Sequence, residues 1–172
     1  MRNRGFTAIE LLVTIAIVAT LLAVAVPAFS HFLVNARIRT FGESMTNALA
    51  AARAEAVRLN TRVVFTLDAN NWRVNRVDNG EQLVSGTGRE SLSAGLRLEI
   101  QPTGATTAMY DSLGRKSGID ADGSEGISRI DILPIASAAA GTYRPLRVQL
   151  LDSGLSRLCD PSSPSTSATA CL

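Results

Sequence analysis

An uncharged, largely apolar run from Leu11 to Leu33, preceded directly by Glu10, most constrains what this chain can fold into. As a helix, Leu11–Phe29 would rise roughly 28 Å at 1.5 Å per residue, which is close to the hydrocarbon thickness of a bilayer. A carboxylate near bilayer depth costs roughly 2.5–3.5 kcal/mol on insertion scales, so we expect Glu10 to be functional. The sequence therefore predicts a membrane-length helix with an acid at its edge.

The residues just before this run form a junction with a specific spacing. A cut after Gly5 would make Phe6 the new N-terminus and place its α-amine about one helical turn from Glu10. These residues resemble the class III signal of type IV prepilins and pseudopilins, in which a dedicated prepilin peptidase cuts after Gly and the new N-terminal Phe is N-methylated. The resemblance implies cleavage between Gly5 and Phe6, methylation of Phe6, an assembly charge at Glu10 and a helix kink at Pro27.

Two alternatives explain the same run without this processing. An ordinary secretory signal peptide would be cut after Ala23-Val24-Ala25, but Glu10 would interrupt its apolar region and Pro27 would crowd the cut. A plain membrane anchor would need only the apolar length. Neither alternative accounts for the order of Gly5, Phe6 and Glu10.

The basic residues Arg2 and Arg4 indicate the orientation of the chain. By the positive-inside rule they stay cytoplasmic, so the bulk of the chain lies across the membrane, which is the periplasm in a bacterium with an outer membrane. We expect a leader peptide at residues 1–5, a transmembrane and filament-core helix at 6–29, and one periplasmic globular domain at 30–172. The precursor would cross the inner membrane once and enter a pilus or pseudopilus after processing.

The two cysteines, Cys159 and Cys171, enclose the C-terminal segment 160–170. That segment contains only Asp, Pro, Ser, Thr and Ala, so it cannot hold itself in place by burying large apolar side chains. In an oxidising compartment we expect a disulfide, which would stabilise the domain by roughly 2–3 kcal/mol. Free or metal-binding thiols are the alternative, although no His or further Cys accompanies them.

The apolar periodicity predicts one helix from Phe6 to about Leu59, followed by strands. Beyond Pro27 the helix becomes amphipathic, with a stripe that needs a partner surface: Met45, Leu49, Ala52, Ala56 and Leu59. After Asn60 the pattern alternates, and the expected strands are Thr61–Leu67, Trp72–Val77, Gln82–Val84, Leu96–Gln101, Thr106–Asp111, Ile127–Leu133, Leu146–Leu151 and Leu155–Leu158. This order indicates an α+β domain whose antiparallel sheet packs on the helix.

Two later segments, Tyr110–Arg115 and Leu146–Gly154, resemble strand–turn signatures of the GspH/FimT group, which comprises H-type minor pseudopilins and FimT/FimU-like minor pilins. The resemblance implies a type IV pilin-like fold. Many members end the last hairpin with Gly-Arg-x-Arg. Here Arg157 matches the second Arg, whereas Leu155 replaces the first. The terminal cysteine pair favours the pilus branch over the secretion branch.

Residues for catalysis or for a resident cofactor are not assembled in this sequence. His31, the only histidine, lies just past Pro27 on the anchor helix, where it cannot meet a nucleophile and a buried acid. We therefore expect that the protein is not an enzyme. Asp120–Glu125 resembles a calcium loop, but its Gly comes too early and the closing Glu is missing at its spacing. We expect a solvated hairpin loop there and no metal site.

DNA binding is a further alternative, because some FimT-like pilins are associated with DNA uptake. A phosphate-contacting patch would need arginines near the C-terminal hairpin, namely Arg144, Arg147 and Arg157, with Arg115 and Lys116 nearby. However, the chain has 17 Lys and Arg against 15 Asp and Glu, and losing Arg2 and Arg4 with the leader would leave 15 of each. We therefore expect solvated strand residues and no DNA binding.

Together these observations predict a minor pilin or pseudopilin, a structural subunit that helps to initiate or cap a filament. A type IV pilus is favoured, type II secretion system protein H is the main alternative, and a pilus-displayed DNA receptor is a further one. The implied partners are the prepilin peptidase, other minor subunits, the major subunit and the assembly platform of the inner membrane.

Overall fold

The computed structural model describes residues 7–68, 71–87, 95–120, 123–135 and 142–171, with Val24, Pro27 and Ala28 described by their backbone alone. Within these residues one helix, α1 (Ala8–Leu59), precedes eight strands. The strands are β1 (Val63–Asp68), β2 (Asn71–Arg76), β3 (Gln82–Thr87), β4 (Leu96–Gln101), β5 (Thr107–Tyr110), β6 (Arg129–Pro134), β7 (Leu146–Leu150) and β8 (Ser156–Cys159). The helix and every strand fall within about three residues of the sequence-based expectation.

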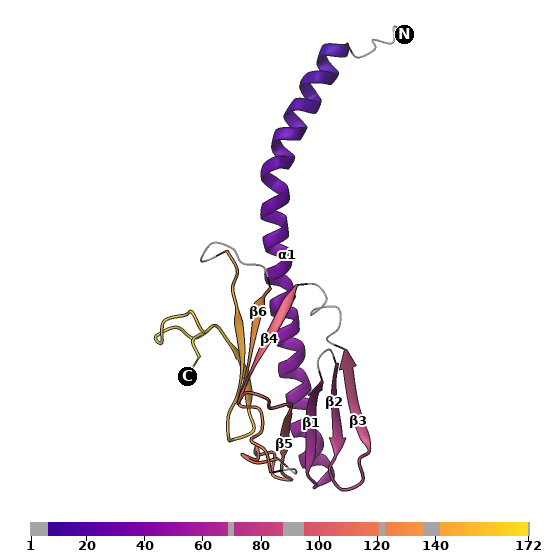
Figure 1. Cartoon of the computed structure of the whole chain (residues 1–172), viewed down its shortest axis with the longest axis vertical. Coiled ribbons are helices and arrows are strands. Elements are labelled where there is room, and N and C mark those ends of the chain that lie inside the picture. The colour runs from indigo at the N-terminus through magenta and orange to yellow at the C-terminus, as the bar shows by residue number, and fades with distance from the viewer. Residues whose placement is uncertain (1–6, 69–70, 88–94, 121–122, 136–141, 172) are drawn as a thin grey trace.

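The 52 residues of α1 form one bowed helix whose N-terminal half projects beyond the sheets and whose C-terminal half packs on them (Figure 1). The helix ends at Asn60, which adopts the left-handed conformation (φ 48°) that only a few residue types tolerate. Its backbone N–H donates to the carbonyls of Ala56 and Val57, so the last turn is closed. Helical backbone continues through Pro27, and the expected kink there stays a prediction.

The strands form two antiparallel sheets, ordered β3-β2-β1-β5 and β4-β6-β7-β8, instead of the single sheet expected from the sequence. Figure 1 shows the two sheets side by side against α1. They are joined through the residues before β6: Ile127 N–H donates to Thr107 O in the first sheet (2.7 Å), and Ser128 N–H donates to Gln101 O in the second (2.8 Å). Both sheets therefore share one surface of the helix.

The core lies between this surface of α1 and the inner faces of the sheets. Met45, Leu49, Ala52 and Ala56 of the expected stripe are fully buried, whereas Leu59 is half-buried, and Ile38 and Phe41 extend the stripe upstream. Facing them are the buried strand residues Val63, Phe65, Val74, Tyr110, Ile130, Ile132 and Val148. Each large apolar side chain removed from water contributes roughly 1.5–3 kcal/mol, so this contact fixes the C-terminal half of α1.

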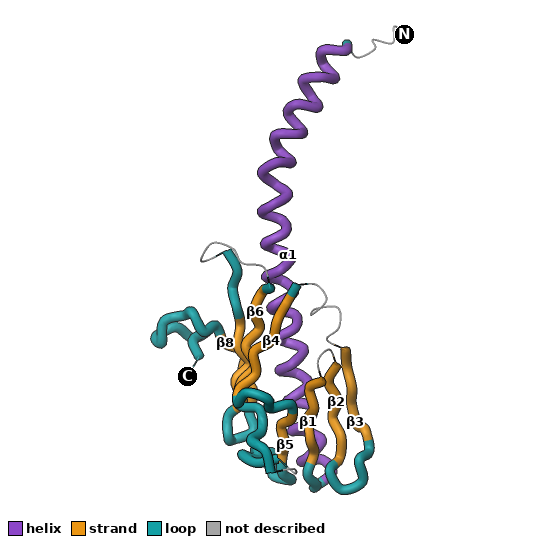
Figure 2. The backbone as a smooth tube through the Cα atoms, in the orientation of Figure 1, coloured by secondary structure: helices purple, strands orange, loops and turns teal. Residues whose placement is uncertain are grey.

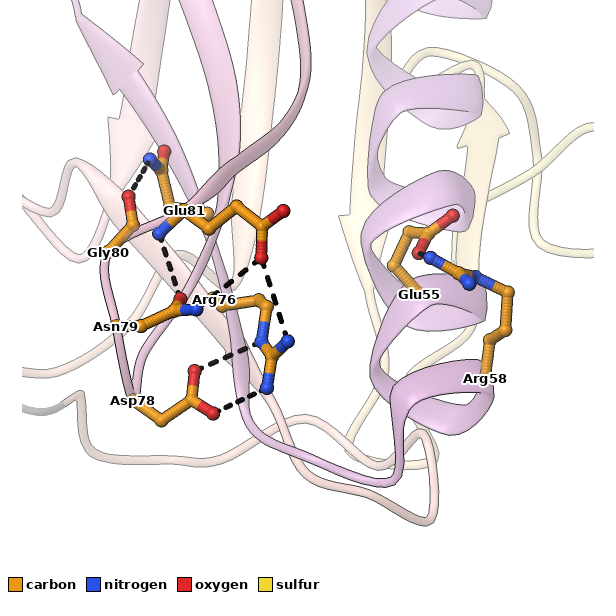
Figure 3. A network of polar contacts seen from close by, with 8 residues as sticks. Glu55, Arg58, Arg76, Asp78, Asn79, Gly80 and Glu81 are labelled. Carbon is orange, nitrogen blue, oxygen red and sulfur yellow. Dashed lines mark hydrogen bonds and ion pairs between the residues drawn. The ribbon is translucent and has the colours of Figure 1, made fainter.

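The turn between β2 and β3 is held by charge instead of burial (Figure 3). The Arg76 guanidinium donates to both oxygens of Asp78 (3.0 and 2.6 Å) and lies 3.6 Å from Glu81. These hydrogen bonds hold the pKa of Asp78 below its ordinary value. The network stabilises the Asp78-Asn79-Gly80 turn far from the exposed half of the helix.

Candidate functional site

The start of α1 places Glu10 in a capping box with Thr7. The Glu10 carboxylate accepts from the Thr7 backbone N–H (2.9 Å) and hydroxyl (2.8 Å), and Glu10 N–H donates back to the Thr7 hydroxyl (3.3 Å). This arrangement satisfies donors that a helix N-terminus otherwise leaves open. Gly5 and Phe6 lie outside the described residues, so cleavage, methylation and a Phe6–Glu10 pair stay predictions.

The N-terminal half of α1 presents apolar side chains on all sides. Those at least half exposed include Ile9, Leu11, Leu12, Val13, Ile15, Ile17, Val18, Leu21, Leu22, Val26, Phe29 and Phe32. No helix formed by the described residues reaches the length and apolarity required to cross a bilayer.

His31 lies where the projecting half of α1 meets the globular domain. Its ring contacts Tyr143 edge to face, with the centroids 5.5 Å apart. Four residues on, Asn35 is hydrogen-bonded to the same segment: its amide donates to Thr142 O (3.2 Å), and its carbonyl accepts from Arg144 N–H (2.9 Å). These contacts anchor the segment before β7 on the helix.

A groove of about 630 Å³ runs along the other end of α1, between the helix and two turns of the sheets. Ala50, Ala54 and Val57 line the helix side, and Leu113 and Leu155 line the turns. Leu113 is 70% exposed, Val57 52% and Leu155 51%, so the apolar lining faces solvent. Leu155, which stands where the strand–turn signature described above has an Arg, adds to the apolar lining, while Arg53 and Arg58 also line the groove and supply positive charge.

The two turns at the groove meet through glycines. Gly114 (φ 73°) and Gly154 (φ 82°) both adopt left-handed conformations, and a Cβ on Gly154 would lie 1.9 Å from Gly114 O. The Arg53 Nε–H group donates to the same carbonyl oxygen (2.9 Å). Helix and both sheets therefore converge here on a single peptide group.

The first of these turns is fixed by Asp111. Its carboxylate accepts from the backbone N–H of Arg115 (2.8 Å) and of Leu113 (2.9 Å), and the Arg115 amide chiefly holds the pKa of Asp111 below its ordinary value. The preceding Tyr110 is fully buried, and burial raises its pKa above the ordinary value. The exposed Leu113 is thus carried on a rigid turn.

The arginines considered for DNA contact do not form an open patch. Arg147 binds Asp131 (2.5 Å), and the Arg157 guanidinium donates to Ala170 O. Arg147 and Arg157 are half-buried, so the expectation of solvated side chains was wrong for both, whereas Arg144 and Arg115 are exposed. Lys116 donates to Ile127 O (3.2 Å). That these residues do not contact DNA stays a prediction.

The C-terminal disulfide is confirmed: Cys159 and Cys171 are bonded. Asp160 N–H donates to Thr169 O (2.8 Å), which closes the base of the loop together with the disulfide. Cys159 itself is buried on the sheet, so the bridge ties an otherwise unburied segment to the core.

The acidic segment Asp120–Glu125 is a hairpin loop whose described residues Gly123, Ser124 and Glu125 are exposed, as expected, and Asp120 is the exception. Asp120 is only 7% exposed, and one of its carboxylate oxygens accepts from the Thr107 hydroxyl. Ala121 and Asp122 lie outside the described residues. Among those described, no group of three acidic, His or Cys residues is placed to hold a metal ion.

Sequence reasoning missed the groove because its residues come from three distant segments. The signal was nevertheless present in Asp111-Ser112-Leu113-Gly114 and Asp152-Ser153-Gly154-Leu155, two turns that each pair an Asp-Ser start with a Gly and an adjacent Leu. Neither turn alone indicates that the two leucines share a rim.

Comparisons with known proteins agree with this geometry. The family described as Type II transport protein GspH matches residues 42–154, and the prokaryotic N-terminal methylation motif matches residues 1–26. No curated protein matches the chain. Two crystal structures of the type IV minor pilin FimU from Pseudomonas aeruginosa are similar: one at 13% identity and a TM-score of 0.56, covering 76% of this chain and 93% of that one. The other has 12% identity and a TM-score of 0.54, covering 75% and 98%. At such identities the likeness concerns the fold alone.

Proposed function

The chain belongs to the GspH family and is a minor pilin or pseudopilin, a structural subunit and not an enzyme, and on that premise we propose that it serves a type IV pilus. The observation that supports a role in filament assembly is the division of α1 into a buried half and an apolar half left uncovered by its own domain. The exposed apolar half of such a helix needs lipid or other protein subunits to cover it.

The N-terminal methylation motif implies processing by a prepilin peptidase. We propose that the peptidase cuts between Gly5 and Phe6, that Phe6 is then N-methylated, and that residues 6–29 hold the precursor in the inner membrane. The globular domain would face the periplasm, where the disulfide between Cys159 and Cys171 is favoured.

Assembly follows from the physics of the exposed half of α1. Its apolar surface can leave lipid only if the helices of neighbouring subunits replace the lipid around it. Glu10 would then pair with the α-amine of Phe6 in an adjacent subunit, because neutralising both charges removes the cost of burying either one. The partners are thus other minor subunits, the major subunit and the assembly platform.

Two features favour the pilus over secretion. The fold resembles a minor pilin of type IV pili, and the C-terminal cysteine pair is closed into a disulfide loop. The alternative, an H-type pseudopilin of type II secretion, is favoured by the name of the matching family.

Deleting the gene for this chain in the cells that make it distinguishes the pilus role from the secretion role. We expect loss of surface filaments, unchanged secretion of folded exoproteins, and recovery of filaments when the wild-type chain is restored. Normal filaments with blocked secretion would overturn the pilus assignment and support the secretion alternative.

A further inference from the structure

The loop enclosed by the C-terminal disulfide has an unusual composition that the assembly role does not use. All residues from Pro161 to Ala170 are Pro, Ser, Thr or Ala. Segments rich in Ser and Thr with Pro are typical carriers of O-linked sugars, because they expose hydroxyls on a backbone that forms no packed core. The composition alone indicates only that this is a segment of the kind that carries O-linked sugars. The geometry of the loop identifies which hydroxyls are open to modification.

The loop is fixed at its base and stands away from the sheets (Figure 2). The disulfide joins Cys159 to Cys171, Asp160 N–H donates to Thr169 O (2.8 Å), and the Arg157 guanidinium donates to Ala170 O. An enzyme could therefore approach the tip of the loop without opening the domain.

Most hydroxyls of the loop are used internally. Ser162 donates to Asp160 (2.5 Å), and Thr169 contacts the hydroxyls of Ser163 (3.2 Å) and Ser167 (2.9 Å). These bonds draw the two sides of the loop together. They also occupy four of the six hydroxyl groups.

The remaining two hydroxyls lie at the tip. Ser167 N–H donates to Pro164 O (2.8 Å), which closes a turn with Ser165 and Thr166 at its two corners. Both residues are exposed, and neither hydroxyl has a partner among the residues that the structure describes. Corner positions of a turn point their side chains outward, so both hydroxyls are open to a transferase.

We propose that Ser165 and Thr166 form an O-glycosylation site. The side-chain oxygen attacks the anomeric carbon of a glycosyl phosphate or diphosphate donor, a C–O bond forms, and the anomeric bond to the phosphate breaks. The phosphate leaves with the bonding electron pair, and the hydroxyl proton passes to a base of the transferase. No electron is gained or lost overall.

The surrounding charges favour a sugar over a phosphoryl group as the modification. A phosphate on this tip would need basic partners to be stabilised. Arg157 is committed to Ala170 O, no Lys or Arg lies within the loop itself, and the exposed Arg144 interacts electrostatically with Asp160 at the base of the loop. A neutral sugar needs no such partner, and it would cover the polar tip without disturbing the disulfide at the base.

Intact-mass measurement on the full chain, purified from membranes of cells that naturally make it, tests the site. We expect a mass above that of the processed sequence by a whole number of sugar residues, with fragmentation placing the sugar on Ser165 or Thr166. The double variant Ser165→Ala/Thr166→Ala should lose the added mass completely. The matched control Ser162→Ala, which removes a hydroxyl already bonded to Asp160, should retain it.

Three outcomes would overturn the proposal: an unmodified wild-type mass, an added mass that survives the double substitution, or an added mass that corresponds to phosphate. Electrophoresis without reductant confirms that each variant keeps its disulfide, so that loss of the added mass reflects loss of the hydroxyls. The proposal is independent of whether the chain serves a pilus or a secretion system.

Discussion

At the first turn of α1, the Glu10 carboxylate combines two roles that can be separated. Within one chain it accepts hydrogen bonds from Thr7 and caps the helix. In assembly it is proposed to neutralise the α-amine of a neighbour, which requires its charge. Gln keeps an oxygen that can accept from Thr7 but carries no charge, whereas Ala removes both functions.

We therefore predict that Glu10→Gln and Glu10→Ala are both cleaved and folded, yet both are depleted from sheared filaments. An unpaired buried charge costs roughly 3–5 kcal/mol, which corresponds to a depletion on the order of a hundredfold or more. The measurement is immunodetection of each variant in filament and membrane fractions. Wild-type incorporation of Glu10→Gln would show that capping, and not charge, is what matters.

Gly154 offers a second test at the scale of single residues. Its φ of 82° disfavours a side chain, and a Cβ would lie 1.9 Å from Gly114 O, which is backbone and cannot move aside cheaply. Gly80 has a similar φ of 71° but open space around it.

Gly80→Ala should thus cost about 1–2 kcal/mol from backbone strain, and Gly154→Ala roughly 1–3 kcal/mol more from the clash. Urea unfolding of the fragment 30–172 measures both. Equal losses would contradict the close contact between the two turns at the groove.

At the scale of elements, the helix and strands could be predicted because their signals are local. Apolar residues recur every three or four positions from Met45 to Ala56, which indicates a helix. They alternate in Val63–Asp68, which indicates a strand. The division into two sheets could not be predicted, since it depends on β5 pairing with β1 while β4 pairs with β6. The burial of Asp120 likewise depends on Thr107, a contact that no local pattern encodes.

The same distinction applies to the candidate site. Glu10 and the cysteine pair follow from spacing and compartment, whereas the groove requires Val57, Leu113 and Leu155 to converge from separate elements. The internal pairing of Arg147 with Asp131 also arises only from strand register, where the two residues lie opposite each other.

The disulfide gives a prediction for the C-terminal element. Replacing both Cys159 and Cys171 by Ser should lower the free energy of unfolding of the fragment 30–172 by roughly 2–3 kcal/mol, because the open loop gains conformational freedom when the domain unfolds. Calorimetry with and without reductant checks it. A wild-type melting temperature in the double variant, or no effect of reductant on the wild type, would contradict this role.

At the scale of the whole molecule, charge argues against nucleic-acid binding. Arg147 and Arg157 are bonded internally, and removal of the leader would balance the side-chain charges. We predict that the fragment 30–172 binds duplex DNA no more tightly than about 10⁻⁴ M at physiological salt. Fluorescence anisotropy over a range of salt concentrations measures this.

Arg144→Ala is the informative DNA-binding variant, because Arg144 is exposed and its substitution leaves the Asp131 pair intact. Micromolar binding that weakens steeply with salt and is lost in Arg144→Ala would contradict the prediction and make DNA capture the primary function.

We infer that this chain is processed and then built into a filament through the exposed half of α1. Mass spectrometry of the N-terminal peptide, from both membranes and sheared filaments, tests it most directly. We expect a peptide that begins at N-methylated Phe6 in both fractions. An N-terminus at Val26, an intact Met1, or absence of the processed chain from the filaments would contradict it.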